Sequence, residues 1–171
     1  MTEIELLNKL KNLLKEMKIY AKFLAAGAPG LTQDSLMVDI PGSDELRSRQ
    51  MYISFFPNET EFEGSRLLQF YTQIPVKVTQ ESRQSLLWFL PLVNNLCAIG
   101  HFGLTNEMDV LQFRYVYTLQ RGLTPKWGHM KDLLDLMIYT PDLFQDLFLG
   151  IEAGNSFEEL MPLLSGLDRE G

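Results

Sequence analysis

The stretch from residue 36 to residue 74, LMVDIPGSDELRSRQMYISFFPNETEFEGSRLLQFYTQI, decides the fold prediction. Three runs in it, at 36–40, 51–56 and 67–74, have apolar residues at every second position. Alternation with period two is typical of strands, because successive side chains of a strand point to opposite faces of a sheet. Turn-forming residues follow the first two runs and an acidic stretch precedes the third. The pattern therefore predicts an antiparallel meander of three strands.

Helical patterns lie on both sides of this meander. Before it, residues 3–26 repeat apolar side chains at spacings of three and four, which predicts an amphipathic helix that ends near Gly27. A coiled coil is the alternative interpretation, but the repeat lasts only about three heptads. After the meander, Thr79 is a suitable N-cap for a second helix. Pro91 is expected to kink that helix or divide it in two.

A hairpin and further helices complete the predicted fold. One strand contains Phe102 and Leu104, a turn spans 105–109, and a long strand covers 110–119. Two Thr-Pro pairs then predict a last large helix in two pieces, which start at Thr124 and Thr140 and end before Gly154. In the remaining residues Ser156 and Glu159 form a possible capping box for a short helix.

The element order is therefore α-β-β-β-α-β-β-α, which is α+β: an antiparallel five-stranded sheet with flanking helices. The chain contains no internal repeat or low-complexity linker. We expect a single domain of residues 1–154 and a C-terminal tail of residues 155–171 with a possible short helix.

Composition limits the possible functions. The chain has 171 residues, of which 46% are apolar and 22% charged, with a formal net charge of −7, as in a soluble globular domain. The longest unbroken apolar run, Leu86–Val93, is far shorter than the roughly 20 residues that cross a bilayer. The N-terminus lacks the apolar core of a secretory signal. We therefore expect a cytoplasmic protein without membrane insertion, and the acidic balance disfavours nucleic acid as a partner.

Groups that could carry catalysis are few and scattered. Cys97 is the only cysteine and lies in an apolar helix, where burial weakens a thiol as a nucleophile. His101 and His129 lack metal-ligand spacing, and no nucleophile-elbow or phosphate-binding motif occurs. Four aspartates at helical spacing could bind a cation, although such carboxylates are usually a solvated face: Asp132, Asp135, Asp142 and Asp146. The sequence therefore predicts no enzyme, no cofactor and no metal site.

Surplus apolar residues point instead to an interface. Several strands carry large side chains on both faces, and Arg114 lies among aromatic residues where it could bind a carboxylate or stack on a ring. The competing interpretation of the apolar residues is the ordinary exposure of scattered hydrophobic side chains. The competing interpretation of Arg114 is that it belongs to a polar, outward-facing side of the strand. The candidate protein-interaction residues are Tyr52, Phe56, Tyr71, Trp88, Leu92, Asn95 and Arg114.

Residues 92–104 (LVNNLCAIGHFGL) and 109–115 (DVLQFRY) resemble the YbjN family. That family has a helix ending in asparagine, a Gly-x-Phe entry to the next hairpin, and an arginine in the second strand of the hairpin. The likeness in element order covers residues 3–152. The YbjN fold is similar to that of type III secretion chaperones, which implies a homodimer built around the second helix and nearby strands. Pro91 and the tail after Gly154 depart from the pattern.

The resemblance and the apolar surplus together favour a non-enzymatic, homodimeric protein-interaction module, chaperone-like or regulatory. Its expected partners are a second copy of the chain and an extended segment of another protein. The alternative is a regulatory domain that binds a small metabolite between the sheet and the helices.

Overall fold

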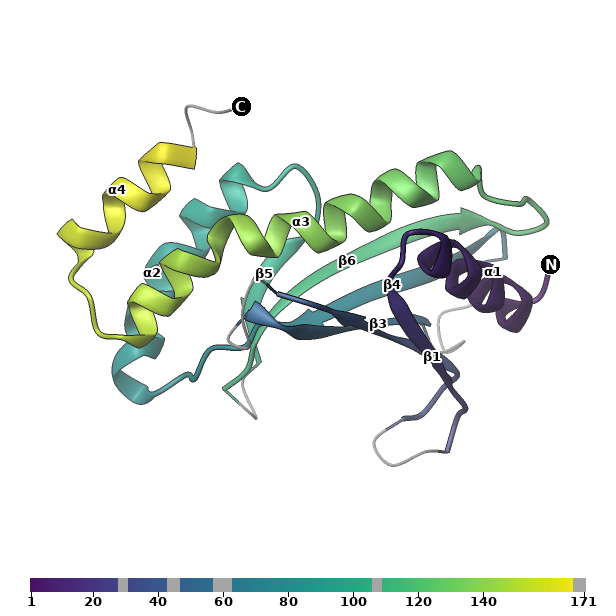
Figure 1. The fold of residues 1–171 in the computed structure, drawn as a ribbon, viewed down its shortest axis with the longest axis horizontal. Coiled ribbons are helices and arrows are strands. Elements are labelled where there is room, and N and C mark those ends of the chain that lie inside the picture. Colours follow the sequence, from purple (N-terminus) through teal and green to yellow (C-terminus); the bar gives the residue numbers. More distant parts are fainter. Residues whose placement is uncertain (28–30, 43–46, 57–62, 106–108, 168–171) are drawn as a thin grey trace.

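The computed structural model describes residues 1–27, 31–42, 47–56, 63–105 and 109–167. A layer of helices lies along one side of a twisted sheet (Figure 1). The elements in chain order are α1 (Glu3–Glu16), β1 (Tyr20–Leu24), β2 (Ser35–Ile40), β3 (Arg49–Phe55), β4 (Ser65–Gln73), α2 (Gln80–Leu96), β5 (His101–Leu104), β6 (Leu111–Gln120), α3 (Trp127–Glu152) and α4 (Phe157–Leu167).

The sheet has the order β1-β2-β3-β4-β6-β5, and every neighbouring pair is antiparallel. The predicted α+β class, with an antiparallel sheet and flanking helices, is confirmed. The predicted number of five strands is wrong, because the described residues form six. The additional strand is β1, which pairs with β2 and makes the meander one strand longer than predicted.

The second half of the first predicted helix, residues 3–26, is also wrong, because part of it forms β1. The helix ends at Glu16, and the chain reverses through Lys18, which has a left-handed φ of 62°. In β1, Ala21 and Phe23 face the helices while Tyr20 and Lys22 are exposed on the other side. Apolar residues in this segment fit both periods, and pairing with β2 selects the extended form.

α2 and α3 each continue through an internal proline. α2 passes through Pro91 undivided, and α3 runs through Pro141 as one helix rather than two pieces. α3 begins two residues later than predicted, with Lys126 rather than Thr124 at its N-cap. Thr79 caps α2 as predicted. The predicted turn at 105–109 lies largely outside the described residues.

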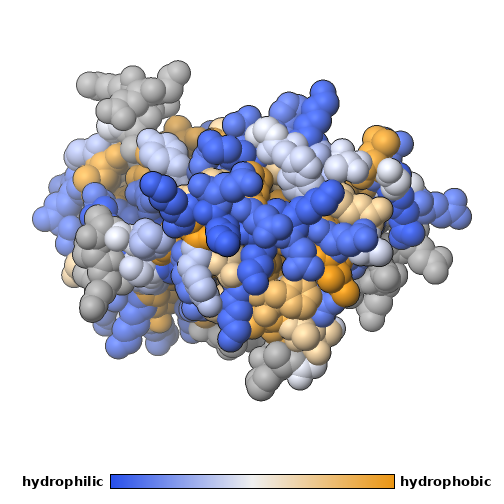
Figure 2. Space-filling view, turned by 45° about the vertical axis from the view of Figure 1, so that its right-hand side comes forward, coloured by the Kyte–Doolittle hydropathy of each residue, from blue (hydrophilic) through white to orange (hydrophobic). Residues whose placement is uncertain are grey.

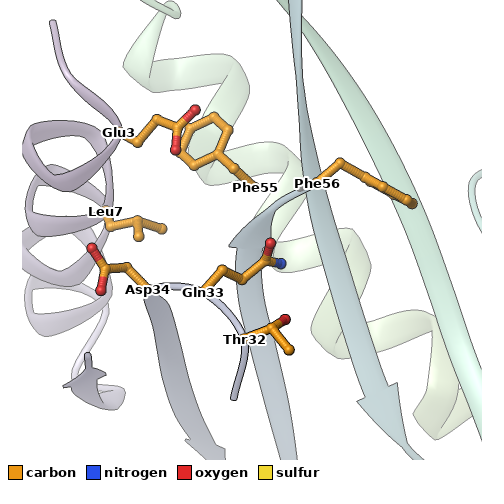
Figure 3. Close-up of a pocket in the computed structure, with 7 residues that line it drawn as sticks. All are labelled: Glu3, Leu7, Thr32, Gln33, Asp34, Phe55 and Phe56. Carbon is orange, nitrogen blue, oxygen red and sulfur yellow. The ribbon is translucent and has the colours of Figure 1, made fainter. Parts of the chain in front are cut away.

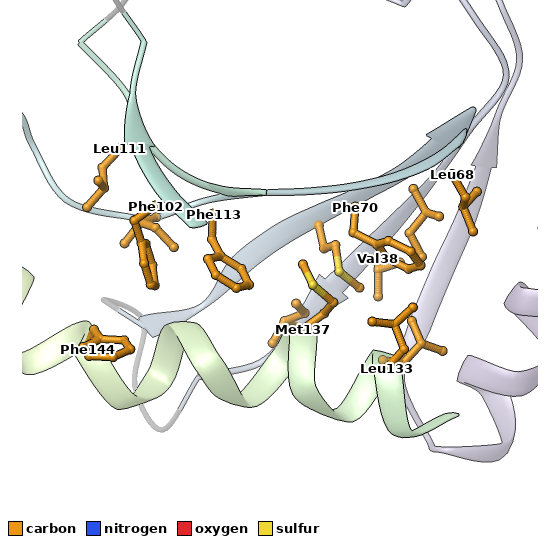
Figure 4. Packing of buried hydrophobic residues seen from close by; sticks show 14 of the residues in the cluster. Val38, Leu68, Phe70, Phe102, Leu111, Phe113, Leu133, Met137 and Phe144 are labelled. Carbon is orange, nitrogen blue, oxygen red and sulfur yellow. The ribbon is translucent and has the colours of Figure 1, made fainter. Parts of the chain in front are cut away.

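One face of the sheet meets α3 in a continuous apolar core (Figure 4). Phe70 and Phe113 are fully buried and point toward α3, which contributes Met137 and Phe144 (Figure 4). Burial of such a side chain stabilises the fold by roughly 1.5–3 kcal/mol. α1 covers the β1–β3 end of the same face with four buried leucines. They are Leu6, Leu7, Leu10 and Leu14.

Two arginines tie β3 and the segment before it to α3. The Arg49 side chain is 1% exposed, and its guanidinium donates to Asp142 at 2.6 Å and to the carbonyl oxygen of Ile138. Arg47 forms an ion pair with Asp146, also at 2.6 Å. Both aspartates are exposed, as expected of a solvated helix face, and each accepts a hydrogen bond from an arginine side chain.

The β5 edge of the sheet is closed by α2. The Asn94 side chain donates to the Phe102 carbonyl oxygen at 3.0 Å and accepts from the Phe102 amide at 2.7 Å. These backbone groups point away from β6, so the amide of Asn94 replaces the neighbouring strand that the edge lacks. Gly100 precedes this strand with a φ of 69°, and a Cβ there would meet the Phe113 ring at 2.6 Å.

Removal of the carboxylate at position 142 would leave the buried guanidinium of Arg49 without its anion. We expect Asp142→Ala to lower the free energy of unfolding by about 2–3 kcal/mol, somewhat less than for a fully buried pair, because the aspartate is half exposed. The matched control is Asp135→Ala, whose exposed pair with Lys131 spans 3.5 Å and should contribute less than about 0.5 kcal/mol. Urea unfolding of both variants measures the difference, and equal losses would contradict the assignment.

Asn94 and Asn95 are adjacent, but only the side chain of Asn94 bonds to β5. Asn94→Ala removes both bonds to the edge of β5 and should cost about 1–3 kcal/mol. The Asn95 side chain is exposed and has no hydrogen bond within the described residues, so Asn95→Ala should change stability by less than about 0.5 kcal/mol. Thermal unfolding compares the two. A similar small loss in both would show that Asn94 does not hold this edge.

Candidate functional site

Four of the predicted interaction residues lie on the sheet face that no described helix covers. Tyr52 pairs with Tyr71, and Tyr71 pairs with Arg114, so the three form one row across β3, β4 and β6. Met37 of β2 extends the row on one side. This open face follows from strand parity, because the intervening residues of the same strands are buried under the helices.

Arg114 is held in place by two neighbours on this face. Its guanidinium carbon lies 5.1 Å from the centre of the Phe56 ring, and its Nε donates to Gln69 Oε1 at 3.0 Å. Burial, with a smaller contribution from Tyr52, raises the pKa of Tyr71, so its hydroxyl stays protonated at neutral pH. Arg114 thus stacks on a ring, as the sequence suggested, and still has further N–H donors.

A hollow of about 470 Å³ lies beside this row. Tyr52, Tyr71 and Gln69 line it from the sheet. Leu24 at the end of β1 and Leu31 in the connection to β2 line it from the other side. Its volume is in the range of small-molecule sites, but it opens widely to the surface. The hollow offers hydroxyl and amide groups beside apolar side chains, which suits recognition rather than catalysis.

A second, smaller pocket of about 270 Å³ lies where α1 meets the ends of β2 and β3. Figure 3 shows Glu3 and Leu7 of α1 on one side of this pocket and Phe55 of β3 across from them, whereas Phe56 points away from α1. Gln33 separates this pocket from the larger hollow and donates to Ser54 Oγ at 3.0 Å.

The other three predicted residues, Trp88, Leu92 and Asn95, share the exposed side of α2. Leu87 and Pro91, which directly precede Trp88 and Leu92, are exposed as well. Trp88 is 68% exposed, the largest fraction among the exposed large hydrophobic residues of the described chain. These five residues are named the α2 stripe. The structure therefore divides the predicted residues between two separate surfaces, the open sheet face and the helix layer.

Sequence reasoning missed the contribution of α4 to this second surface. Phe157 is exposed and its ring centre lies 5.2 Å from that of Phe89. Together with Trp88 and Leu160 it lines an apolar groove of about 370 Å³ between α2 and α4. The predicted capping box of Ser156 and Glu159, which is present, was the signal that a helix would begin there.

No protein-family model matches the sequence, and neither a curated protein nor a solved structure is significantly similar to it.

Groups for covalent or metal chemistry are not brought together in the described part of the chain. His101 is exposed on β5 and His129 is exposed in the first turn of α3. No three histidine, cysteine or acidic side chains gather into a metal-binding group among the described residues. Within the same residues no helix is long and apolar enough to cross a membrane.

Cys97 should be a poor nucleophile at neutral pH. Burial raises the pKa of its thiol to about 11, and the Sγ lies 3.4 Å from the Val93 carbonyl oxygen. Because only the thiolate reacts, we expect the rate of alkylation by iodoacetamide to increase with pH up to about 11, whereas a free thiol titrates near about 8.5. The rate measured from pH 7 upward, with glutathione as the control, checks this. A midpoint near that of glutathione would contradict it.

Proposed function

We propose that this protein is a non-enzymatic interaction module that forms a homodimer through the α2 stripe and binds an extended segment of another protein. The observation that carries the proposal is the gathering of exposed apolar side chains on α2 and α4, around Trp88 and Phe157. In water, such a continuous apolar surface is stabilised when a partner covers it.

The distribution of charge favours a second copy of the chain as the partner that covers the α2 stripe. The chain carries a net charge of −7, yet residues 84–106 contain no aspartate, glutamate, lysine or arginine. In a two-fold dimer the same patch meets itself, so any charge near the axis faces a like charge. The α2 stripe is therefore a surface on which two acidic chains can approach with little repulsion.

The resemblance of residues 92–104 and 109–115 to the YbjN family belongs to the same proposal, with the chaperone-like fold, dimer and cytoplasmic location that we infer for it. Three residues of the shared motif are physically linked: Asn94 bonds to Phe102, and Gly100 packs against the ring that Phe102 contacts. Such links give a structural reason for the motif to occur as a unit.

A small-metabolite-binding domain is the second candidate, favoured by the size of the hollow beside Tyr52 and Tyr71. This hollow lies on the open sheet face, not between the sheet and the helices, where the sequence predicted a pocket. A molecule that bound there would raise the melting temperature, because it would bind only the folded chain. That hollow and the α2 stripe lie on different surfaces, so the two candidates are tested separately.

The oligomeric state tests the dimer. We expect light scattering coupled to size exclusion to give twice the chain mass of 19.7 kDa for the wild type, and the single mass for Trp88→Glu, which places a charge where the stripe meets itself. The matched control is Tyr139→Glu. Tyr139 is 58% exposed on α3, so the same charge is added outside the stripe, and that variant should remain a dimer.

Two results would overturn the dimer. One is a wild-type chain that stays at the single mass at micromolar concentrations. The other is a Trp88→Glu variant that keeps the double mass while its far-ultraviolet circular dichroism matches that of the wild type.

A further inference from the structure

The two edges of the sheet are finished differently. At β5 the Asn94 side chain bonds the outward amide and carbonyl of Phe102. At β1, the other edge, the described residues show no equivalent bond to the outward backbone groups of Tyr20–Leu24. Alternate residues of an edge strand direct their N–H and C=O groups away from the sheet. The β1 edge is therefore a place where one more strand can pair.

Lysines lie close to the start of this edge in an otherwise acidic protein. Residues 9–22 contain five lysines and one acidic residue, Glu16, although the chain as a whole has a net charge of −7. Lys11, Lys15 and Lys18 line a hollow of about 610 Å³ with Ile19 and Tyr20, between α1 and the start of β1. The hollow and its three lysines are named the lysine groove.

The lysine side chains of this groove, Lys11, Lys15 and Lys18, are not paired with acidic side chains of the described residues. Lys9, by contrast, lies over the Trp127 ring, with its Nζ 5.7 Å from the centre. Figure 2, which brings the α1 side of the molecule forward, shows hydrophilic side chains over most of that face.

Lys18 occupies a position that ordinarily suits glycine. Its amide donates to the Lys15 carbonyl oxygen at 3.0 Å, and that of Ile19 donates to the Leu14 carbonyl oxygen at 2.9 Å. This is the hydrogen-bond pattern with which helices end on a left-handed residue, usually glycine because it has no Cβ. The chain thus has a lysine in the lining of the groove, and its left-handed backbone conformation is less stable for lysine than for glycine.

We propose that the β1 edge binds an acidic, extended segment of another protein as an added strand, with its carboxylates paired to the lysine groove. The free edge supplies backbone hydrogen bonds, and the side chains at every second position of the added strand face α1, where the lysines lie. A second copy of this edge is a poor occupant, since its lysines would meet lysines. Nucleic acid cannot supply the backbone groups, and the rest of the acidic chain repels it.

The proposal names the partner chemistry for the segment-binding half of the proposed function, on which it rests. The homodimer and the binding of an extended segment can be tested independently, because the α2 stripe and the lysine groove are on different elements. A wild-type chain that stays at the single mass and still binds the peptide would overturn the dimer and leave this inference standing.

The probe is a blocked peptide of about ten residues, longer than β1, with glutamate alternating with threonine; its partner control has glutamine in place of glutamate. At low salt we expect the acidic peptide to bind more tightly than the control, with affinity falling as salt rises. Hydrogen exchange should slow at amides of β1 and remain unchanged at β5.

Three variants separate charge from fold. Lys18→Gly relieves the left-handed backbone, so it should keep or raise the melting temperature while weakening binding. Lys11→Gln with Lys15→Gln should weaken binding roughly fivefold to tenfold, as the loss of two exposed ion pairs would. The matched control is Lys77→Gln with Lys131→Gln, exposed lysines elsewhere, which changes net charge equally and should leave the affinity unchanged.

Each of the following results would overturn the proposal: equal affinity for the acidic and amide peptides, equal effects of the two double variants, or slowed exchange at β5 rather than β1. Tighter binding of an oligothymidine than of the acidic peptide would assign the lysines to a nucleic-acid partner instead.

Discussion

An antiparallel sheet with one apolar face must have that face covered, and the rest of this structure depends on how α1 and α3 cover it. The buried face takes its side chains from alternate positions of every strand, and Arg49 joins the sheet to α3 through Asp142. Once the helices lie on one side, the intervening positions are left on the open face. The row of Tyr52, Tyr71 and Arg114 is a direct result of that arrangement.

The distribution of charge divides the remaining surface. α2 presents apolar side chains and no charge between Gln84 and Leu96, whereas lysines concentrate between Lys9 and Lys22. An apolar helix face and a basic strand edge favour different partners, because the first is stabilised by burial and the second by pairing with anions and backbone groups. These two surfaces, together with the open sheet face, are the features on which the proposed interaction module rests.

Much of the fold could be predicted because its signals are local. The alternation in β2, β3, β4 and β6 and the cap at Thr79 are properties of short segments, and all are present. β1 could not be predicted in the same way, because its apolar positions suit a helix as well as a strand. Trp88 and Leu92 were found on the exposed face of α2, but their neighbour Phe157 comes from α4, more than sixty residues later.

The sequence by itself determined the α+β class, the faces of most strands and the scarcity of reactive groups, because periodicity and composition are read within a few residues. Only the tertiary structure decided that residues 20–24 join the sheet and that Asp142 and Asp146 bind arginines. It also decided that the Asn94 side chain bonds to the β5 edge of the sheet, whereas three lysines line a hollow beside the β1 edge. These features join residues distant in the chain, and such contacts depend on strand order and register, which local patterns do not encode.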